Sequence, residues 1–212
     1  AARSSDTKYK RRYWTLAVLS ISLIVIALDV TVLNVAIPTL QRELDASALQ
    51  WIVNAYVLVF AGLLLTMGTV GDRFGRRRAL QTGLIVFGIA SLAAAYSQTS
   101  GQLIAARAAQ GVGVALIMPS TLSVLVDVFP REERAKAIGI WAGVAAMGVP
   151  LGMILGGWLL ENYWWGSTFL INVPVVILAL VAGRFLIPES RDPESRRIDV
   201  QGAVISMVGL SA

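Results

Sequence analysis

Six long apolar stretches constrain this chain more than any other feature of its sequence. A membrane-spanning helix needs roughly 20 mostly apolar residues, and six runs of about that length alternate with short polar segments. They cover about residues 14–37, 50–70, 79–98, 103–127, 135–160 and 164–187. With 56% hydrophobic and 15% charged residues, the chain has too little polar surface to coat a water-soluble globule. We therefore predict an all-α polytopic membrane protein.

The hydropathy pattern divides the chain into four parts. We expect a cytoplasmic tail over 1–12, a transmembrane bundle of six helices over 13–187, a cytoplasmic linker over 188–199 and the start of a further helix over 200–212. The linker is polar and contains two prolines. Because the last apolar run is still open at Ala212, we expect the chain to be part of a longer protein.

The basic residues predict the orientation. Five Lys and Arg residues lie in the tail, four between helices 2 and 3, three between helices 4 and 5, and four after helix 6, which leaves only Arg42 and Arg107 of the 18. Short loops rich in Lys and Arg stay in the cytoplasm. We therefore expect a multi-pass protein of the bacterial inner membrane with a cytoplasmic N-terminus. The same distribution explains the net charge of +5 without nucleic acid as a partner.

Composition also excludes several kinds of chemistry. The chain contains no Cys and no His, which removes disulfides, ordinary zinc sites and the usual general base. Its glycine–arginine loop lacks the GxxxxGK[ST] pattern that cradles phosphates. We therefore expect neither an enzyme nor a metal site, and no cofactor.

Two charged residues lie inside apolar runs, where each costs at least about 2.5–3.5 kcal/mol. Asp29 in helix 1 and Arg107 in helix 4 come out at similar depth when each helix rises about 1.5 Å per residue. They can share a water-filled cavity, in which the carboxylate binds and releases a proton, or form an ion pair that only orients two helices. Thr31, Asn34 and Gln110 add polar groups nearby and serve equally well as interhelical hydrogen-bond partners.

The segment between helices 2 and 3 combines glycines with a dense run of charges. It contains Gly68, Asp72, Arg73, Gly75 and Arg76. Glycines allow a tight turn and a close approach of two helices. We expect Asp72 and Arg76 to meet Asp127, at the cytoplasmic end of helix 4, in a charge cluster that latches helices together. The alternative is ordinary positive-inside charge.

Helix 5 carries a stripe of small residues. Gly148, Gly152 and Gly156 recur every four residues, with Gly157 beside them, and such stripes let helices pack closely in lipid. Pro150 removes a backbone hydrogen bond, so we expect a bend there. A closely packed, bendable helix suits gating as well as packing.

Four segments resemble those of one transporter superfamily. Residues 28–38, LDVTVLNVAIP, are similar to the helix 1 motif of the fourteen-helix drug/proton antiporters, and residues 68–77 resemble the loop signature GxLaDrxGrk. The run from Leu103 to Ala115 resembles the helix 4 motif associated with proton transfer. Residues 148–157 resemble the antiporter motif GxxxGPxxGG, with Met153 in place of its proline. The chain thus resembles the N-terminal half of a major facilitator superfamily transporter.

This resemblance implies a fold and a function. The superfamily fold has two six-helix bundles, each made of two inverted three-helix repeats, with helices 1 and 4 lining the cavity. The implied partners are a small-molecule substrate, the lipid bilayer and a C-terminal bundle. The implied function is proton-coupled export of drugs, antibiotics or lipophilic, cationic compounds, with Asp29 as proton carrier and Arg107 beside it. The alternative is a uniporter or symporter for a sugar or metabolite.

Overall fold

The computed structural model describes the backbone of residues 2–43 and 48–191, and the side chains of 12–43 and 48–191. Within these residues, six helices are long and apolar enough to cross a membrane. The predicted all-helical, six-span bundle is therefore confirmed. The further helix expected from Val200 lies outside the described residues, as does the linker beyond Arg191.

The helices follow one another with short connections. Their bounds are α1 Ala2–Glu43, α2 Leu49–Phe74, α3 Arg76–Ala95, α4 Ser100–Val128, α5 Arg131–Asn162, α6 Ser167–Leu170 and α7 Asn172–Leu186. The sixth span, Ser167–Leu186, consists of the short α6 and α7, which a turn at Ile171 separates. At the start of α4, the Thr99 side chain accepts a hydrogen bond from the Gln102 amide, which satisfies one free donor of the helix end.

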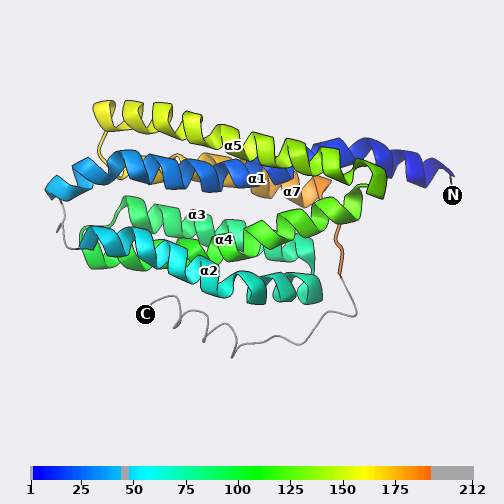
Figure 1. Cartoon of the computed structure of the whole chain (residues 1–212), viewed down its shortest axis with the longest axis horizontal. Coiled ribbons are helices and arrows are strands. Elements are labelled where there is room, and N and C mark those ends of the chain that lie inside the picture. The colour runs from blue at the N-terminus through cyan, green and yellow to red at the C-terminus, as the bar shows by residue number, and fades with distance from the viewer. Residues whose placement is uncertain (1, 44–47, 192–212) are drawn as a thin grey trace.

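The six spans form two layers. Figure 1 shows α1, α5 and α7 above α2, α3 and α4. In one layer α1 packs against α5 and α7, while in the other α4 packs against α2 and α3; the layers meet where α3 contacts α7 and α1 contacts α4. Exchanging the first three spans with the last three turns the contacts of one layer into those of the other and leaves the two contacts between the layers unchanged. The packing therefore has the two three-helix repeats expected of the fold.

Glycines permit the closest helix contacts. A Cβ added at Gly148 would lie 2.6 Å from the Ala27 Cβ, and one at Gly152 would lie 2.8 Å from the Thr31 Cβ. The α5 stripe thus packs on α1, and van der Waals contact of this kind drives helix association in lipid. In the other layer, Gly83 of α3 and Gly113 of α4 bring their backbones together in the same way.

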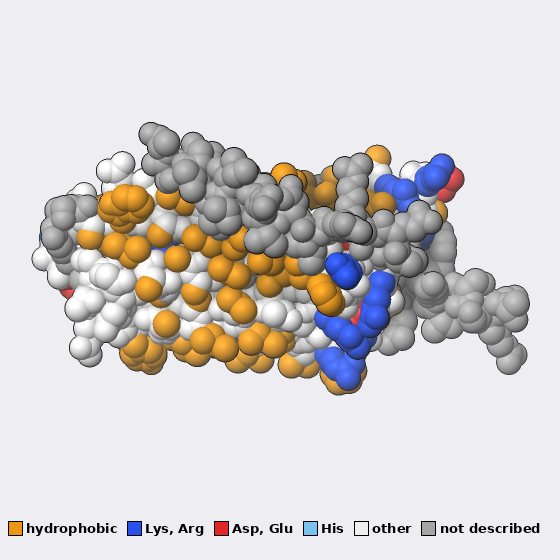
Figure 2. All heavy atoms as spheres, turned by 90° about the horizontal axis from the view of Figure 1, so that it is seen from below, with side chains coloured by type: hydrophobic (Ala, Val, Ile, Leu, Met, Phe, Trp, Pro, Cys, Tyr) orange, Lys and Arg blue, Asp and Glu red, His pale blue; other side chains and the backbone are white. Residues whose placement is uncertain are grey.

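The surface of the bundle suits a lipid environment. Large apolar side chains are widely exposed, including Leu65 at 82% and Ile154 at 70%. Figure 2 shows hydrophobic side chains along the visible face and basic side chains gathered at the end where α2 passes into α3. An apolar surface of this extent needs lipid as its solvent. The chain is a multi-pass membrane protein.

Candidate functional site

An ion pair occupies the middle of the bundle. Asp29 of α1 and Arg107 of α4 meet with 2.5 Å between Asp29 Oδ2 and Arg107 Nη1. Their contact agrees with the similar depth predicted from the sequence. Of the two predicted alternatives, the structure shows the buried ion pair, because the two side chains are 0% and 2% exposed. Since helices 1 and 4 occupy equivalent places in the two repeats, the pair joins the repeats at their centre.

Three further polar side chains complete the network. Gln110 Nε2 donates to Asp29 Oδ1 at 2.9 Å, and its Oε1 accepts from Arg107 Nη1 at 2.7 Å. Asn172 Nδ2 of α7 donates to the same Asp29 oxygen at 2.8 Å. The Ser91 hydroxyl of α3 accepts from Gln110 Nε2 at 2.9 Å. Four helices therefore converge on Asp29.

The opposite side of Arg107 faces α2. Its Nε donates to the Ile52 carbonyl at 3.4 Å, and its guanidinium lies 4.2 Å from the centre of the Tyr56 ring. A cation over an aromatic face is attracted by the ring, most strongly where water is excluded. Arg107 is thus held from several directions, and α2 becomes part of the same unit.

The other predicted polar neighbours do not join this network. The Thr31 hydroxyl donates to the Ala27 carbonyl of its own helix at 2.8 Å, so its predicted role as an interhelical partner is wrong. Thr31 instead supplies the methyl surface against Gly152. Asn34 is exposed and lies on a different face of α1 from Asp29.

The side chains around Asp29 present donors to both of its carboxylate oxygens. Asp29 Oδ2 accepts from a guanidinium and Oδ1 accepts from two amides. A charge away from water is tolerated only when it is paired and hydrogen-bonded, and both conditions are met here. Protonation of Asp29 would place a donor among these donors, so at least one of the bonds would have to change.

A second cluster lies at the end of the bundle where α2 meets α3. Arg76 Nε pairs with Asp72 Oδ1 at 2.8 Å and Arg76 Nη1 with Asp127 Oδ1 at 3.1 Å. The three residues predicted to form a charge cluster therefore meet, and they tie α2, α3 and α4 together. The side chains are 16%, 32% and 44% exposed for Arg76, Asp72 and Asp127.

Glu189 lies beside this cluster, in the segment after α7 that the sequence analysis treated only as a linker. Glu189 Oε2 lies 3.5 Å from Arg77 Nε and 3.6 Å from Arg78 Nε. It also covers Gly75, whose φ of +119° and lack of a Cβ leave room for it. The Arg76 amide donates to the Ser190 carbonyl at 3.0 Å, so the backbone of this segment is held as well.

The remaining loop residues have other contacts. Gly68 faces the Pro119 ring of α4, where an added Cβ would make ordinary van der Waals contact at 3.4 Å. The Arg73 guanidinium lies 5.7 Å from the centre of the Phe74 ring. These two residues flank the cluster without entering the Asp72–Arg76–Asp127 contacts that the structure describes.

In the α5 motif the structure divides packing residues from exposed ones. Gly148, Gly152 and Gly156 all face α1, whereas a Cβ at Gly157 would meet open space. Pro150 is exposed, and α5 runs as one uninterrupted helix from Arg131 to Asn162. Pro150 therefore does not interrupt the helix, and the bend expected there stays a prediction.

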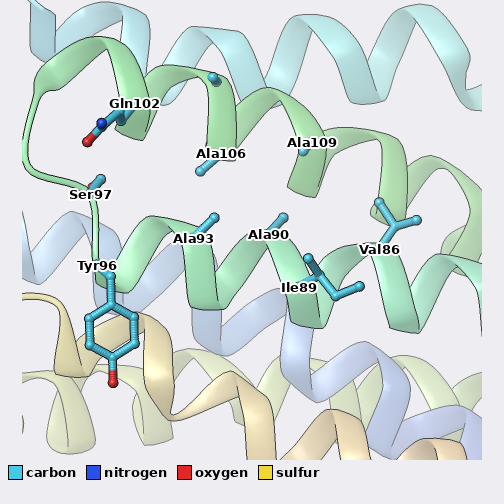
Figure 3. A pocket seen from close by; sticks show the side chains of 10 residues that line it. Val86, Ile89, Ala90, Ala93, Tyr96, Ser97, Gln102, Ala106 and Ala109 are labelled. Carbon is cyan, nitrogen blue, oxygen red and sulfur yellow. The ribbon is translucent and has the colours of Figure 1, made fainter.

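A groove of about 670 Å³ between α3 and α4 lies apart from both clusters. Figure 3 shows small side chains of the two helices facing one another across it, with Tyr96, Ser97 and Gln102 at one end. None of the predicted site residues lines it. The chemistry-bearing residues thus lie in the packed interior and at the α2–α3 end.

Comparison with known proteins agrees with this class of membrane bundle. The family model of the Major Facilitator Superfamily matches residues 19–210, and the chain belongs to that family. A structure of the proton:xylose symporter XylE, bound to 6-bromo-6-deoxy-D-glucose, superposes with a TM-score of 0.75 at 17% identity, over 85% of this chain and 46% of that one. The fold is the N-terminal half of the superfamily fold.

Two curated relatives have names that refer to resistance or efflux. The methyl viologen resistance protein SmvA of Salmonella typhimurium is 41% identical over 203 residues, which is 94% of this chain and 41% of that protein. The multidrug efflux pump LfrA of Mycolicibacterium smegmatis is 44% identical over 206 residues, 95% of this chain and 41% of that protein. The chain thus spans about 41% of the length of either relative.

Proposed function

We propose that this bundle is the proton-coupling half of an exporter for drugs or lipophilic, cationic compounds. The observation that carries the proposal is the buried Asp29–Arg107 pair, in which the carboxylate accepts hydrogen bonds from three side chains. An ionisable residue inside a membrane is costly and usually functional. Relatives named for multidrug efflux and for resistance to methyl viologen or puromycin support export as the direction.

In the proposed cycle, the two bundles of the complete transporter rock between inward-open and outward-open states. A proton from outside binds Asp29 and releases Arg107 from its partner. The changed network then lowers the affinity for substrate, which leaves outward. Arg107 takes part in returning the proton, and Gln110 keeps the two groups in register through its contacts to both.

The cytoplasmic latch is the second part of the proposal. Arg76 joins Asp72 and Asp127 only while the ends of α2, α3 and α4 stay together. We place this end in the cytoplasm of a bacterial cell, because short loops rich in basic residues stay inside. The closed latch then favours the outward-facing state.

The test uses the full-length natural protein in inside-out membrane vesicles. A pH gradient, acid inside, is imposed and ethidium uptake is followed by fluorescence in wild type and in Asp29→Asn at matched abundance. Gradient-driven uptake that is lost in Asp29→Asn supports the proposal. Uptake that survives in the variant removes Asp29 as the proton site. A wild type that accumulates no ethidium, but does accumulate a sugar or riboflavin, replaces drug export with metabolite transport, which the name of a 33%-identical riboflavin transporter favours.

A further inference from the structure

Asn172, like Ser91, joins the central network but belongs to none of the sequence motifs. Asn172 is the first residue of α7 and is completely buried. Its Nδ2 donates to Asp29 Oδ1 at 2.8 Å and lies 3.4 Å from the Ser91 hydroxyl. Its amide oxygen, also buried, accepts no hydrogen bond from the described residues. A buried polar atom without a partner is costly, so this oxygen calls for an explanation.

The reason follows from counting donors and acceptors around Asp29. In the ionised form, the carboxylate only accepts, and it receives bonds from Arg107, Gln110 and Asn172. Once protonated, the carboxyl group carries an O–H that needs an acceptor. Gln110 Oε1 already accepts from Arg107, and the Ser91 hydroxyl already accepts from Gln110. The Asn172 oxygen is the amide acceptor of this network that is not yet used.

We propose that Asn172 is a proton-responsive positioning residue for Asp29. It donates through Nδ2 to the carboxylate and, after its amide turns over, accepts through Oδ1 from the carboxylic acid. Turning the amide over gives up the N–H···O contacts from Nδ2 to Asp29 and Ser91 and forms one O–H···O bond from the carboxylic acid, so the new O–H has an acceptor. This inference rests on the proposed proton binding at Asp29, and it adds α7 to the helices that respond to the proton.

The charged or titratable groups that face Asp29 are Arg107 from α4 and, beyond the guanidinium, Tyr56 from α2. The buried Tyr56 hydroxyl also has no partner among the described residues, and Asn172 differs from it in already contacting the carboxylate. The side that α3 presents carries the neutral Ser91. On α5 the charged residues lie at the ends of the helix, at 131–136 and at Glu161, and α6 carries no titratable residue.

The experiment reads the carboxyl group directly. Purified full-length protein in lipid vesicles is titrated with acid, and the C=O band of buried carboxylic acid is followed by infrared difference spectroscopy. Four proteins are compared, namely wild type, Asp29→Asn, Asn172→Leu and the control Asn162→Leu. The Asn162→Leu substitution makes the same chemical change outside the network, because Asn162 is exposed and donates to the Trp158 carbonyl of its own helix.

We expect a band in wild type that disappears in Asp29→Asn and moves to higher frequency in Asn172→Leu, because the acid O–H has lost its acceptor. The control should keep the wild-type band. A band that stays in place in Asn172→Leu overturns the role of Asn172 and leaves the proton site standing. A wild type without a band that depends on Asp29 overturns the proposed function as well.

A second measurement needs no variant that disturbs the packing. In wild type grown with isotope-labelled asparagine, the side-chain amide band should change in step with the carboxyl band during the same titration. A labelled band that does not change while the carboxyl band grows contradicts the turnover of the Asn172 amide.

Discussion

The bundle contains two clusters in which arginine binds aspartate, and they differ in their solvent. The Asp29–Arg107 pair is 0–2% exposed and joins α1 to α4, whereas Arg76 is 16% exposed beside partners at 32% and 44%. Removing one partner of a buried pair strands a charge and costs about 3–5 kcal/mol. Exposed pairs contribute about 0.2–1 kcal/mol. Arginine–aspartate pairs should therefore contribute much more to the free energy of unfolding in the interior than at the α2–α3 end.

The largest expected effect on stability comes from removing one partner of the buried pair. Arg107→Leu leaves the Asp29 carboxylate buried with only amide donors, and we expect it to lower the free energy of unfolding by about 3–5 kcal/mol. Unfolding of the purified protein in detergent measures the loss. The double variant Asp29→Leu with Arg107→Leu removes both charges and should recover most of it. A double variant as unstable as the single one contradicts the assignment of the cost to a stranded charge.

The next effect separates packing from charge. Gly148→Ala places a Cβ 2.6 Å from the Ala27 Cβ and should destabilise the bundle by about 1–3 kcal/mol. Gly139→Ala, on the same helix, meets nothing within 4 Å and should stabilise it by up to about 1 kcal/mol through helix propensity. Thermal unfolding of the two variants side by side tests the α1–α5 interface. Equal effects would mean that the interface is looser than described.

At the α2–α3 turn, backbone conformation matters more than charge. Gly75 has a φ of +119°, and a residue with a Cβ costs about 1–3 kcal/mol there. We expect Gly75→Ala to lose this amount and to expel Glu189 from its place. Adding Glu189→Ala should relieve the collision but not the backbone strain, so the double variant remains less stable than Glu189→Ala alone. Full recovery in unfolding measurements would show that the collision, not the conformation, is decisive.

The smallest effect on stability belongs to the exposed cluster. Arg76→Gln should lower the free energy of unfolding by at most about 1 kcal/mol, with a difference that shrinks as salt is added. Ethidium transport by the same variant should nevertheless fall if the cluster is a latch. A variant that loses several kcal/mol would place Arg76 in the same class as Arg107 and remove the contrast between the clusters.

The sequence was informative where a residue violated its surroundings. Asp29 and Arg107 stand out because charge is expensive in an apolar helix, and helix geometry alone set them at one depth. Gly148, Gly152 and Gly156 stand out through their spacing. In each case a strong local cost or a regular period carried the signal.

The sequence did not predict the contacts of residues whose type is common at their position. Asn172 and Ser91 are small polar residues outside every motif, and only the fold brings Asn172 to Asp29 and Ser91 to Gln110. Glu189 follows a proline in a polar segment, and its value depends on a glycine more than a hundred residues earlier. Contacts between distant, unremarkable residues cannot be read from composition or periodicity.

Proton release on substrate binding tests the central claim most directly. Purified full-length protein in weakly buffered detergent solution is mixed with ethidium, and the pH change is followed with wild type, Asp29→Asn and Arg76→Gln. The account predicts release of protons by wild type and by Arg76→Gln, and none by Asp29→Asn. Release that persists in Asp29→Asn would contradict the claim that the buried network, and not another group of the transporter, carries the proton.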